Sequence, residues 1–522
     1  MPYRSSIFSQ RILLATFHLL VIVLVGLHLV VLQLPPTDTP IPNLDDPEAA
    51  WWGFWPATYL PDEIGFVIAV LFVGGIIVWW LREWHWHSNA TEFVHPASAG
   101  RSTFFQYAPL HVAISHNRLL SIILLVIAVF LAVSFFIFPI AHTRWGDADI
   151  LSRAIAWPDP TLRLTHSWQA PLDVWLHSQL WLALHQQAGW TDATPTYQIL
   201  SPIAGFIYLG VTVALSQSGW PSVNWLTFGL LVSLGLIQLF FGYIENYSFA
   251  AAGVLLYLWL GLRLLRRKEN LWLPALCLGV TMSLHPSTGI LLPSLLYLGV
   301  CQASRRNTVF PIGTFAQMAL PIFFMFGITT WIMERGGHGL IAWFTKDRPG
   351  GGDGRWFVPI VEVSTRWEHY TMFSWLHIRD FLNQQILVAP VVLPSLLIIM
   401  AFYWNNRKKH SESSARDLDH STLGPSYALL LSVTQERLFL TIASIFYLGL
   451  TFVWNPDYGG QRDWDLFSLA ALPTTLLLAW HLPSVFSLLR YLIAAALPLL
   501  LFQILHTLTW VYQNTLPWAW PE

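Results

Sequence analysis

Long apolar runs constrain this chain more than any other feature of its sequence. A helix needs roughly 20 apolar residues to cross the hydrocarbon core of a bilayer. Runs of about that length recur along the whole chain. They predict about thirteen spans, at residues 12–34, 64–81, 119–141, 197–216, 222–241, 246–265, 271–285, 287–303, 308–333, 384–404, 436–454, 466–483 and 490–512. The chain is therefore expected to be an all-α integral membrane protein, and 271–303 either crosses twice or forms one broken helix.

The composition supports the same class. Charged residues make up 11% of the chain and hydrophobic residues 55%, whereas soluble domains are about a quarter charged. The net charge of −2 argues against nucleic acid as a partner. Both cysteines, Cys277 and Cys301, lie in apolar runs, which excludes a disulfide framework and a cysteine-ligated zinc site. The first run is too long for a cleavable signal, so we interpret it as a signal anchor.

Clusters of Lys and Arg in short loops predict which side of the membrane each loop occupies, because such loops stay cytoplasmic. A cytoplasmic N-terminus, with two crossings in 271–303, puts every cluster inside: 4–11, 263–268, 305–306 and 407–409. The loops 35–63, 142–196 and 334–383 then lie outside, together with most of the acidic residues. We expect a multi-pass protein of the plasma membrane, in which the polar segment 405–435 is a cytoplasmic linker.

The outer loop after the third span has an unusual concentration of polar side chains. Asp147 and Asp149 follow that span in the segment WGDADIL. A single loop acid is usually just solvated, but two acids on a turn that begins with glycine, before an amphipathic segment, favour a functional site. Residues 171–187 have apolar residues at helical spacing, and they predict a helix that lies in the membrane interface. We predict that Asp147 or Asp149 is catalytic.

Further polar groups fall on the same expected face. Glu245 occupies a very short turn, where helix capping is an equal alternative to function. His285 interrupts an apolar run, and ionisable groups inside a membrane are candidates for function. Arg462 can bind a phosphate with two hydrogen bonds. The predicted substrate-binding residues are Arg153, His166, Glu245, Tyr247, His285, His377, Asp380, Arg462, Asp463 and Asp465.

Neither a nucleotide loop nor a metal site is required by the sequence. The segment 346–356 is rich in glycine, but no strand with a phosphate-binding pattern precedes it, so we interpret it as a mobile flap. His377, Asp380 and Asn383 share a helix face, although such spacing is common by chance. The acids leave a divalent cation open as a cofactor, and no spacing demands one.

Acids, histidines and arginines at one membrane face suit a substrate that is both anionic and membrane-anchored. A sugar on a polyprenyl phosphate has these properties: its lipid lies between helices, its phosphate meets arginine, and its sugar meets polar side chains. Transfer of that sugar needs one carboxylate to take the acceptor's proton while C1 is attacked, and a single base suffices for inversion.

With these residues the chain resembles the GT-C superfamily of polytopic glycosyltransferases. The resemblance rests on WGDADIL and the helix at 171–187, and on segments similar to those of bacterial members: YIENYSF, LHPSTGILLPSLLYLG, HIRDFLNQQILVAP and QRDWDLFSLAALP. It implies a catalytic domain at 119–512, a two-helix N-terminal addition at 1–118 that includes a cytoplasmic loop, and an external tail at 513–522. It also implies a lipid-phosphate-sugar donor and a glycan, lipid or protein acceptor at the external face.

Three other classes of protein remain as alternatives. A transporter or flippase of an anionic or lipid-linked substrate would place ionisable residues near mid-span and show a repeated half. A polymerase or ligase of lipid-linked glycans would use the same class of donor. In a non-catalytic polytopic subunit the acidic loops would simply be solvated.

Overall fold

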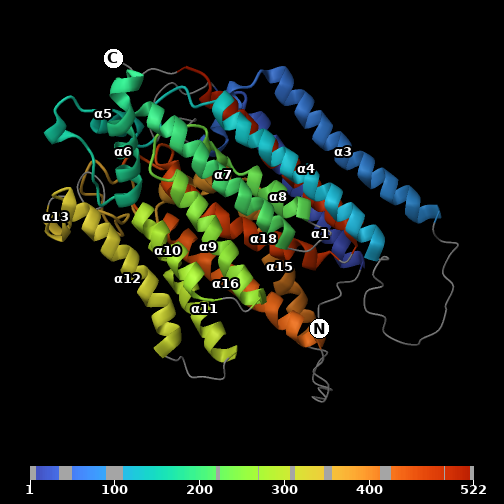
Figure 1. Cartoon of the computed structure of the whole chain (residues 1–522). Helices are drawn as coiled ribbons and strands as arrows, with labels where there is room; N and C mark the ends of the chain where they lie inside the picture. The colour runs from blue at the N-terminus through green and yellow to red at the C-terminus, as the bar shows by residue number, and fades with distance from the viewer. Residues whose placement is uncertain are drawn as a thin grey trace.

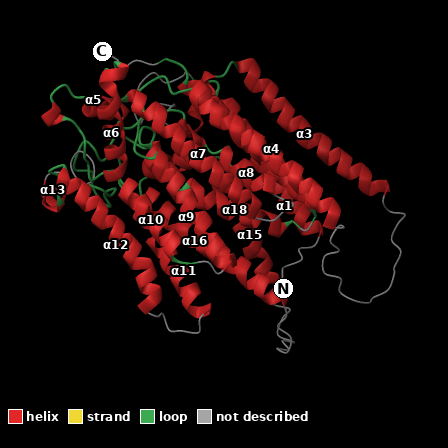
Figure 2. Ribbon diagram, in the orientation of Figure 1, coloured by secondary structure: helices red, strands yellow, loops and turns green. Residues whose placement is uncertain are grey.

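The computed structural model describes residues 7–34, 50–89, 110–218, 224–267, 270–305, 312–345, 355–411, 425–486 and 488–517. These ranges are almost entirely helical and contain no strand, as Figure 2 shows, although Phe357 and Trp454 form an isolated β-bridge. The expected all-helical, multi-pass architecture is confirmed. Parts of five predicted segments lie outside the described residues: the outer loop 35–63, the cytoplasmic loop, the glycine-rich flap, the linker and the tail.

The helices are distributed along the whole chain. The first half contains α1 (Ile7–Val31), η1 (Trp52–Tyr59), α3 (Asp62–Asn89), α4 (Leu110–Ile137), α5 (Ala148–Ile155), η3 (Pro160–Leu162), α6 (Pro171–Ala188), α7 (Thr194–Ser218), α8 (Asn224–Val232), η5 (Gly235–Phe240) and α9 (Ser248–Arg267). The second half contains α10 (Trp272–Leu284), η6 (Pro286–Leu291), α11 (Leu292–Arg305), α12 (Ile312–Arg335), α13 (Leu340–Thr345), α14 (Trp375–Val388), α15 (Val392–Ser411), α16 (Pro425–Val453), α17 (Trp464–Ser468), α18 (Ala471–Val485) and α19 (Leu489–Asn514). In both lists η marks a 3₁₀ helix.

Fewer helices are long enough to cross a membrane than the sequence predicted. Among the described residues ten qualify, or eleven if α14 and α15, which meet at a 105° bend, form one span. The expected count was about thirteen. The two remaining runs are shorter helices: 222–241 divides into α8 and η5, and the run at 271–285 contains α10, which has 13 residues.

Tertiary packing explains the break between α8 and η5. Leu234 is extended there, with φ −65° and ψ 141°. Gly235 follows, and a Cβ added to it would lie 2.7 Å from the carbonyl oxygen of Leu387. Only glycine allows so close an approach of two backbones. The apolar run therefore ends its α-helix where another part of the chain packs against it.

Apolar side chains face outward on the peripheral helices. Of the ten candidate spans, α3, α4 and α12 are among the least buried, and Figure 1 shows α3 and α12 along opposite edges of the bundle. Phe66, Phe130 and Phe323 are each about two-thirds exposed or more. A surface of this kind is unfavourable in water and suits lipid hydrocarbon. By contrast, α18 is the most enclosed span and packs against α8, α15 and α16.

The two ends of the bundle differ. Figure 2 shows loops gathered at the end that carries α5 and α6. At the far end of α9, Arg266 donates two hydrogen bonds of 2.6 and 2.8 Å to the carboxylate of Glu436. Trp480 donates a third, of 2.8 Å, to the same carboxylate. Glu436 is buried, so Arg266 supplies the countercharge that this carboxylate requires.

We expect Arg266→Ala to lower the free energy of unfolding by about 3–5 kcal/mol, because the buried carboxylate of Glu436 loses its cation. Thermal unfolding of the purified protein in detergent measures the change. Arg153→Ala is the matched control, because Arg153 belongs to a surface pair whose arginine is 70% exposed and which is worth about 0.5 kcal/mol. Equal stability losses in the two variants would contradict the role of the buried pair.

Candidate functional site

Two loops far apart in sequence are joined by reciprocal hydrogen bonds. The amide of Gly146, between α4 and α5, donates to the carbonyl oxygen of Arg462 at 3.0 Å. The Nε of Arg462, in the turn before α17, donates to the carbonyl oxygen of Gly146 at 3.1 Å. Gly146 has φ +49°, a conformation that glycine adopts without strain. This pair holds Asp147 beside the turn that carries Arg462.

A third loop brings further carboxylates to the same place. Glu245, between η5 and α9, accepts hydrogen bonds from the backbone amides of Asp147 and Asn246. Asp465, in α17, accepts a hydrogen bond of 3.0 Å from the hydroxyl of Tyr243. A Cβ added to Gly146 would lie 3.2 Å from an oxygen of Asp465 and closer still to one of Glu245.

We call Asp147, Glu245, Asp463 and Asp465 the carboxylate cluster. Asp147, Glu245 and Asp465 come from different loops, and Asp463 lies two residues before Asp465. A carboxylate oxygen of Asp463 accepts a hydrogen bond of 2.9 Å from the amide of Tyr458. Glu245 and Asp465 are buried, whereas Asp147 is half-buried. Asp147 is therefore a member that a substrate can reach.

Burial and mutual repulsion raise the pKa values of this cluster. Burial, and then the charges of Asp465 and Asp147, raise the pKa of Glu245 well above its usual value. The pKa of Asp463 is raised well above its usual value, chiefly by burial. Like charges so close together make ionisation of each neighbour less favourable. The cluster therefore binds protons more readily than solvated carboxylates do.

Asp147 has a more balanced environment. Burial raises its pKa, while a hydrogen bond from Tyr458, the charge of Arg462 and a hydrogen bond from Gln169 lower it. The guanidinium of Arg462 also lies over the ring of Tyr458, 4.3 Å from the ring centroid. The charge of Arg462 thus acts directly on the carboxylate of Asp147.

The structure separates the two aspartates that the sequence could not distinguish. Asp147 precedes α5 and belongs to the cluster, whereas Asp149 lies in its first turn and pairs with Arg153 at 3.0 Å. The side chains of Asp149 and Arg153 are 28% and 70% exposed. This is a surface ion pair of neighbouring helix turns, and it leaves Asp147 as the stronger catalytic candidate.

The predicted histidines are distributed around the cluster rather than within it. His166 lies parallel to His338, with ring centroids 5.8 Å apart. His285 caps η6 and packs against Tyr247, with 4.6 Å between ring centroids. Tyr247 in turn lies within the electrostatic influence of the carboxylate cluster. Its pKa is raised first by burial and then by the charges of Asp465 and Glu245.

Asp380 and His377 form a second polar group beside the first. One oxygen of Asp380 accepts from the hydroxyl of Tyr370 at 2.8 Å and from the amide of Gly460 at 3.1 Å. Its other oxygen accepts from the indole of Trp52 at 2.6 Å. His377 stacks on Tyr370, with ring centroids 4.9 Å apart. Gly460 lies in the same turn as Arg462, so this turn connects both polar groups.

Several residues at the site have no predicted role in the sequence analysis. Trp52 of η1 reaches Asp380 although 328 residues separate them, and no local pattern indicates such a contact. Arg144 is fully buried, with its guanidinium 4.2 Å from the ring centroid of Trp55. In the sequence, Arg144 directly precedes Trp145 and Gly146. Its burial could not be predicted, because the sequence alone does not show which side chains are enclosed.

The helix predicted at 171–187 is present as α6, with Pro171 in its first turn. It carries a buried pair that the sequence analysis missed: the Nδ1 of His177 lies 3.1 Å from a carboxylate oxygen of Asp173. The ring of His177 stacks on Tyr197 of α7 at 3.9 Å. The i, i+4 spacing of Asp173 and His177 was the signal that could have found the pair.

In the described part of the chain, no group of three or more His, Cys, Asp or Glu side chains has the arrangement of a metal site. The divalent cation therefore stays a prediction. Comparison with known proteins found no similar protein-family model, curated protein or solved structure. The functional argument accordingly depends on the geometry of the site.

We expect Gly146→Ala to destabilise the protein more than Gly189→Ala. Both glycines have positive φ, of +49° and +68°, and alanine in that conformation costs about 1–2 kcal/mol. A Cβ at Gly189 meets nothing within 4 Å, whereas one at Gly146 overlaps Glu245. Thermal unfolding of both variants measures the difference. Equal losses would show that the loops are not packed as described.

Proposed function

We propose that this protein is a multi-pass membrane glycosyltransferase that moves a sugar from a polyprenyl-phosphate donor to an acceptor. The observation that carries this proposal is the position of Asp147, half-buried and held beside Arg462 where three loops meet at one end of an apolar helical bundle. A carboxylate and an arginine at this position suit a donor that is lipid-anchored at one end and charged at the other.

In the proposed step, an acceptor hydroxyl oxygen forms a bond to C1 of the sugar while the bond from C1 to the phosphate oxygen breaks. The phosphate leaves with the electron pair, and the acceptor's proton passes to the carboxylate of Asp147. Attack from the side opposite the phosphate inverts C1. The pKa of Asp147, raised by burial, makes it a better proton acceptor than an ordinary aspartate.

Arg462 is proposed to face the phosphate of the donor. Its guanidinium donates a hydrogen bond to the carbonyl oxygen of Gly146 and lies over the ring of Tyr458. The position of the guanidinium is therefore fixed before the substrate binds. A fixed cation stabilises the charge that develops on a leaving phosphate without having to reorganise. The remaining acids and Tyr247 are proposed to contact the sugar hydroxyls.

The apolar side chains near the site support a lipid-borne donor. In the segment before α14, Ile360, Val361 and Phe373 are each about two-thirds exposed or more. The side chains of Ile341 and Phe344 in α13 are equally accessible. Exposed apolar residues next to charged ones are typical of a surface that meets both lipid and a polar head group.

The proposed location follows from charge. Arg263, Arg266 and Arg305 lie at the ends of α9 and α11 away from the carboxylate cluster. Arginine-rich short connections stay cytoplasmic, so we propose that the cluster faces the outside of the plasma membrane and that the N-terminus is cytoplasmic. The acceptor, whether glycan, lipid or protein, would then be a component of the cell envelope.

A transporter is less well supported by the same residues. It would place ionisable groups along a path near mid-span. Buried acids of the ten candidate spans lie instead near span ends: Glu83 is the last residue of its span, and Glu436 and Asp465 lie near the starts of theirs. This distribution argues against a path of carboxylates through the bundle.

We expect Asp147→Asn to reduce sugar transfer by about 10²–10⁴-fold, the usual contribution of a general base. Asp149→Asn should leave transfer nearly unchanged, because Asp149 belongs to the surface pair with Arg153. Release of polyprenyl phosphate, measured in membrane vesicles over a panel of polyprenyl-phosphate sugars, reports the reaction. A folded Asp147→Asn protein with full activity would disprove the assignment of the base.

We expect Tyr458→Phe to move the acidic limb of kcat/KM to higher pH. The limb reports ionisation of the base, and the hydrogen bond from Tyr458 lowers the pKa of Asp147. Without that bond the carboxyl keeps its proton to higher pH, and transfer is lost earlier as pH falls. The control variant Tyr370→Phe loses a hydrogen bond to Asp380 and not to Asp147. The acidic limb of its kcat/KM profile should therefore stay at the wild-type pH. Identical pH profiles for Tyr458→Phe and wild type would contradict the proposed base.

A further inference from the structure

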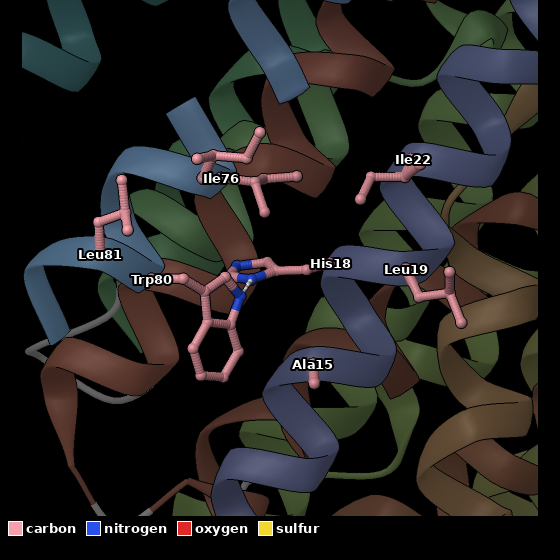
Figure 3. A pocket seen from close by; sticks show the side chains of 8 residues that line it. Ala15, His18, Leu19, Ile22, Ile76, Trp80 and Leu81 are labelled. Carbon is pink, nitrogen blue, oxygen red and sulfur yellow. Dashed lines mark hydrogen bonds between the residues drawn. The ribbon is translucent and has the colours of Figure 1, made fainter. Parts of the chain in front are cut away.

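An open groove of about 470 Å³ lies between α1 and α3, outside the site described above. Figure 3 shows His18 of α1 facing Trp80 of α3 across it. It is lined by Ala15, His18, Leu19, Ile22, Ile76, Ile77, Trp80 and Leu81. Six of these eight side chains are purely aliphatic, so the lining is mostly hydrocarbon.

The polar atoms of the groove are already paired with one another or with backbone. The indole of Trp80 donates to the Nδ1 of His18 at 2.9 Å. The Nε2 of His18 lies 2.9 Å from the carbonyl oxygen of Ala494 in α19. His18 must therefore carry its proton on Nε2 and is neutral, with both nitrogens engaged. A polar ligand finds no partner here, whereas a hydrocarbon chain loses nothing on entering.

One end of the groove is positively charged. Arg11 lies one helical turn before Ala15, on the same face of α1. Its guanidinium is 3.4 Å from a carboxylate oxygen of Glu83 in α3, and Arg490 at the start of α19 is 3.6 Å from the same oxygen. Two arginines thus share one glutamate, an excess of one positive charge.

We propose that this groove binds an anionic phospholipid, with one acyl chain between α1 and α3 and the phosphate against Arg11 and Arg490. Arginine binds phosphate through charge-assisted hydrogen bonds, and the excess positive charge selects a lipid with a net negative head group over a zwitterionic one. The site lies toward the end of α1 that is remote from η1, so the lipid belongs to the leaflet opposite the carboxylate cluster. Its acyl chain fills the space beside α3, the least enclosed of the candidate spans.

Native mass spectrometry of the purified protein, after incubation with phosphatidylglycerol or phosphatidylcholine of identical acyl chains, tests this site. We expect one phosphatidylglycerol to be retained in preference to phosphatidylcholine. Arg490→Gln should weaken its retention about fivefold, and Ala15→Trp, which fills the groove, should abolish it. Arg153→Gln changes an exposed arginine at the other end of the molecule and should retain the lipid as wild type does.

Equal retention of the two lipids would overturn the proposal, as would phosphatidylglycerol retention that neither variant reduces. Displacement of phosphatidylglycerol by an equimolar polyprenyl phosphate would also overturn it, because the groove would then be a site for a polyprenyl carrier. If Ala15→Trp does not fold, Arg490→Gln decides the matter, since the side chain of Arg490 is 46% exposed. Asp147→Asn should leave lipid retention unchanged, so this proposal is tested independently of glycosyl transfer.

Discussion

The reciprocal hydrogen bonds between Gly146 and Arg462 are the contact on which the rest of the site depends. They join positions 316 residues apart and fix the backbone that presents Asp147. They also place a cation among carboxylates whose burial would otherwise favour their neutral forms. The left-handed conformation of Gly146 lets Glu245 approach the amide of Asp147. Asp147, Glu245 and Asp465 are thus each held by a group that another loop contributes.

Most of the fold could be predicted because the length of an apolar run is a local property of the sequence. Ten of the predicted spans correspond to single candidate spans, and 384–404 corresponds to the bent pair of α14 and α15. The two that fell short were 222–241 and 271–285. The α-helix of 222–241 ends at Val232, just before Gly235, whose backbone lies against the carbonyl oxygen of Leu387, and such a contact leaves no mark on hydrophobic periodicity. Local patterns predict that an element exists better than they predict where packing interrupts it.

The site was predictable in composition and less so in geometry. The sequence indicated Glu245, Arg462 and Asp465 as polar residues at helix ends, and the structure brings them together. It could not separate Asp147 from Asp149, because that distinction depends on where α5 begins: the helix starts at Ala148, so the two carboxylates point in different directions. Contacts such as Trp52 with Asp380 arise only after distant helices pack.

The span of chain that contributes to the site has a consequence for biogenesis. Trp52, Asp147, Glu245, Asp380 and Arg462 come from the beginning, middle and end of the chain. A chain synthesised from its N-terminus places the first acids in the membrane long before the arginine that balances them. Until α17 is inserted, Asp147 and Glu245 lack that countercharge, and their neutral forms are favoured. The arrangement of these carboxylates around Arg462 is therefore completed only after the chain has been synthesised as far as the turn before α17.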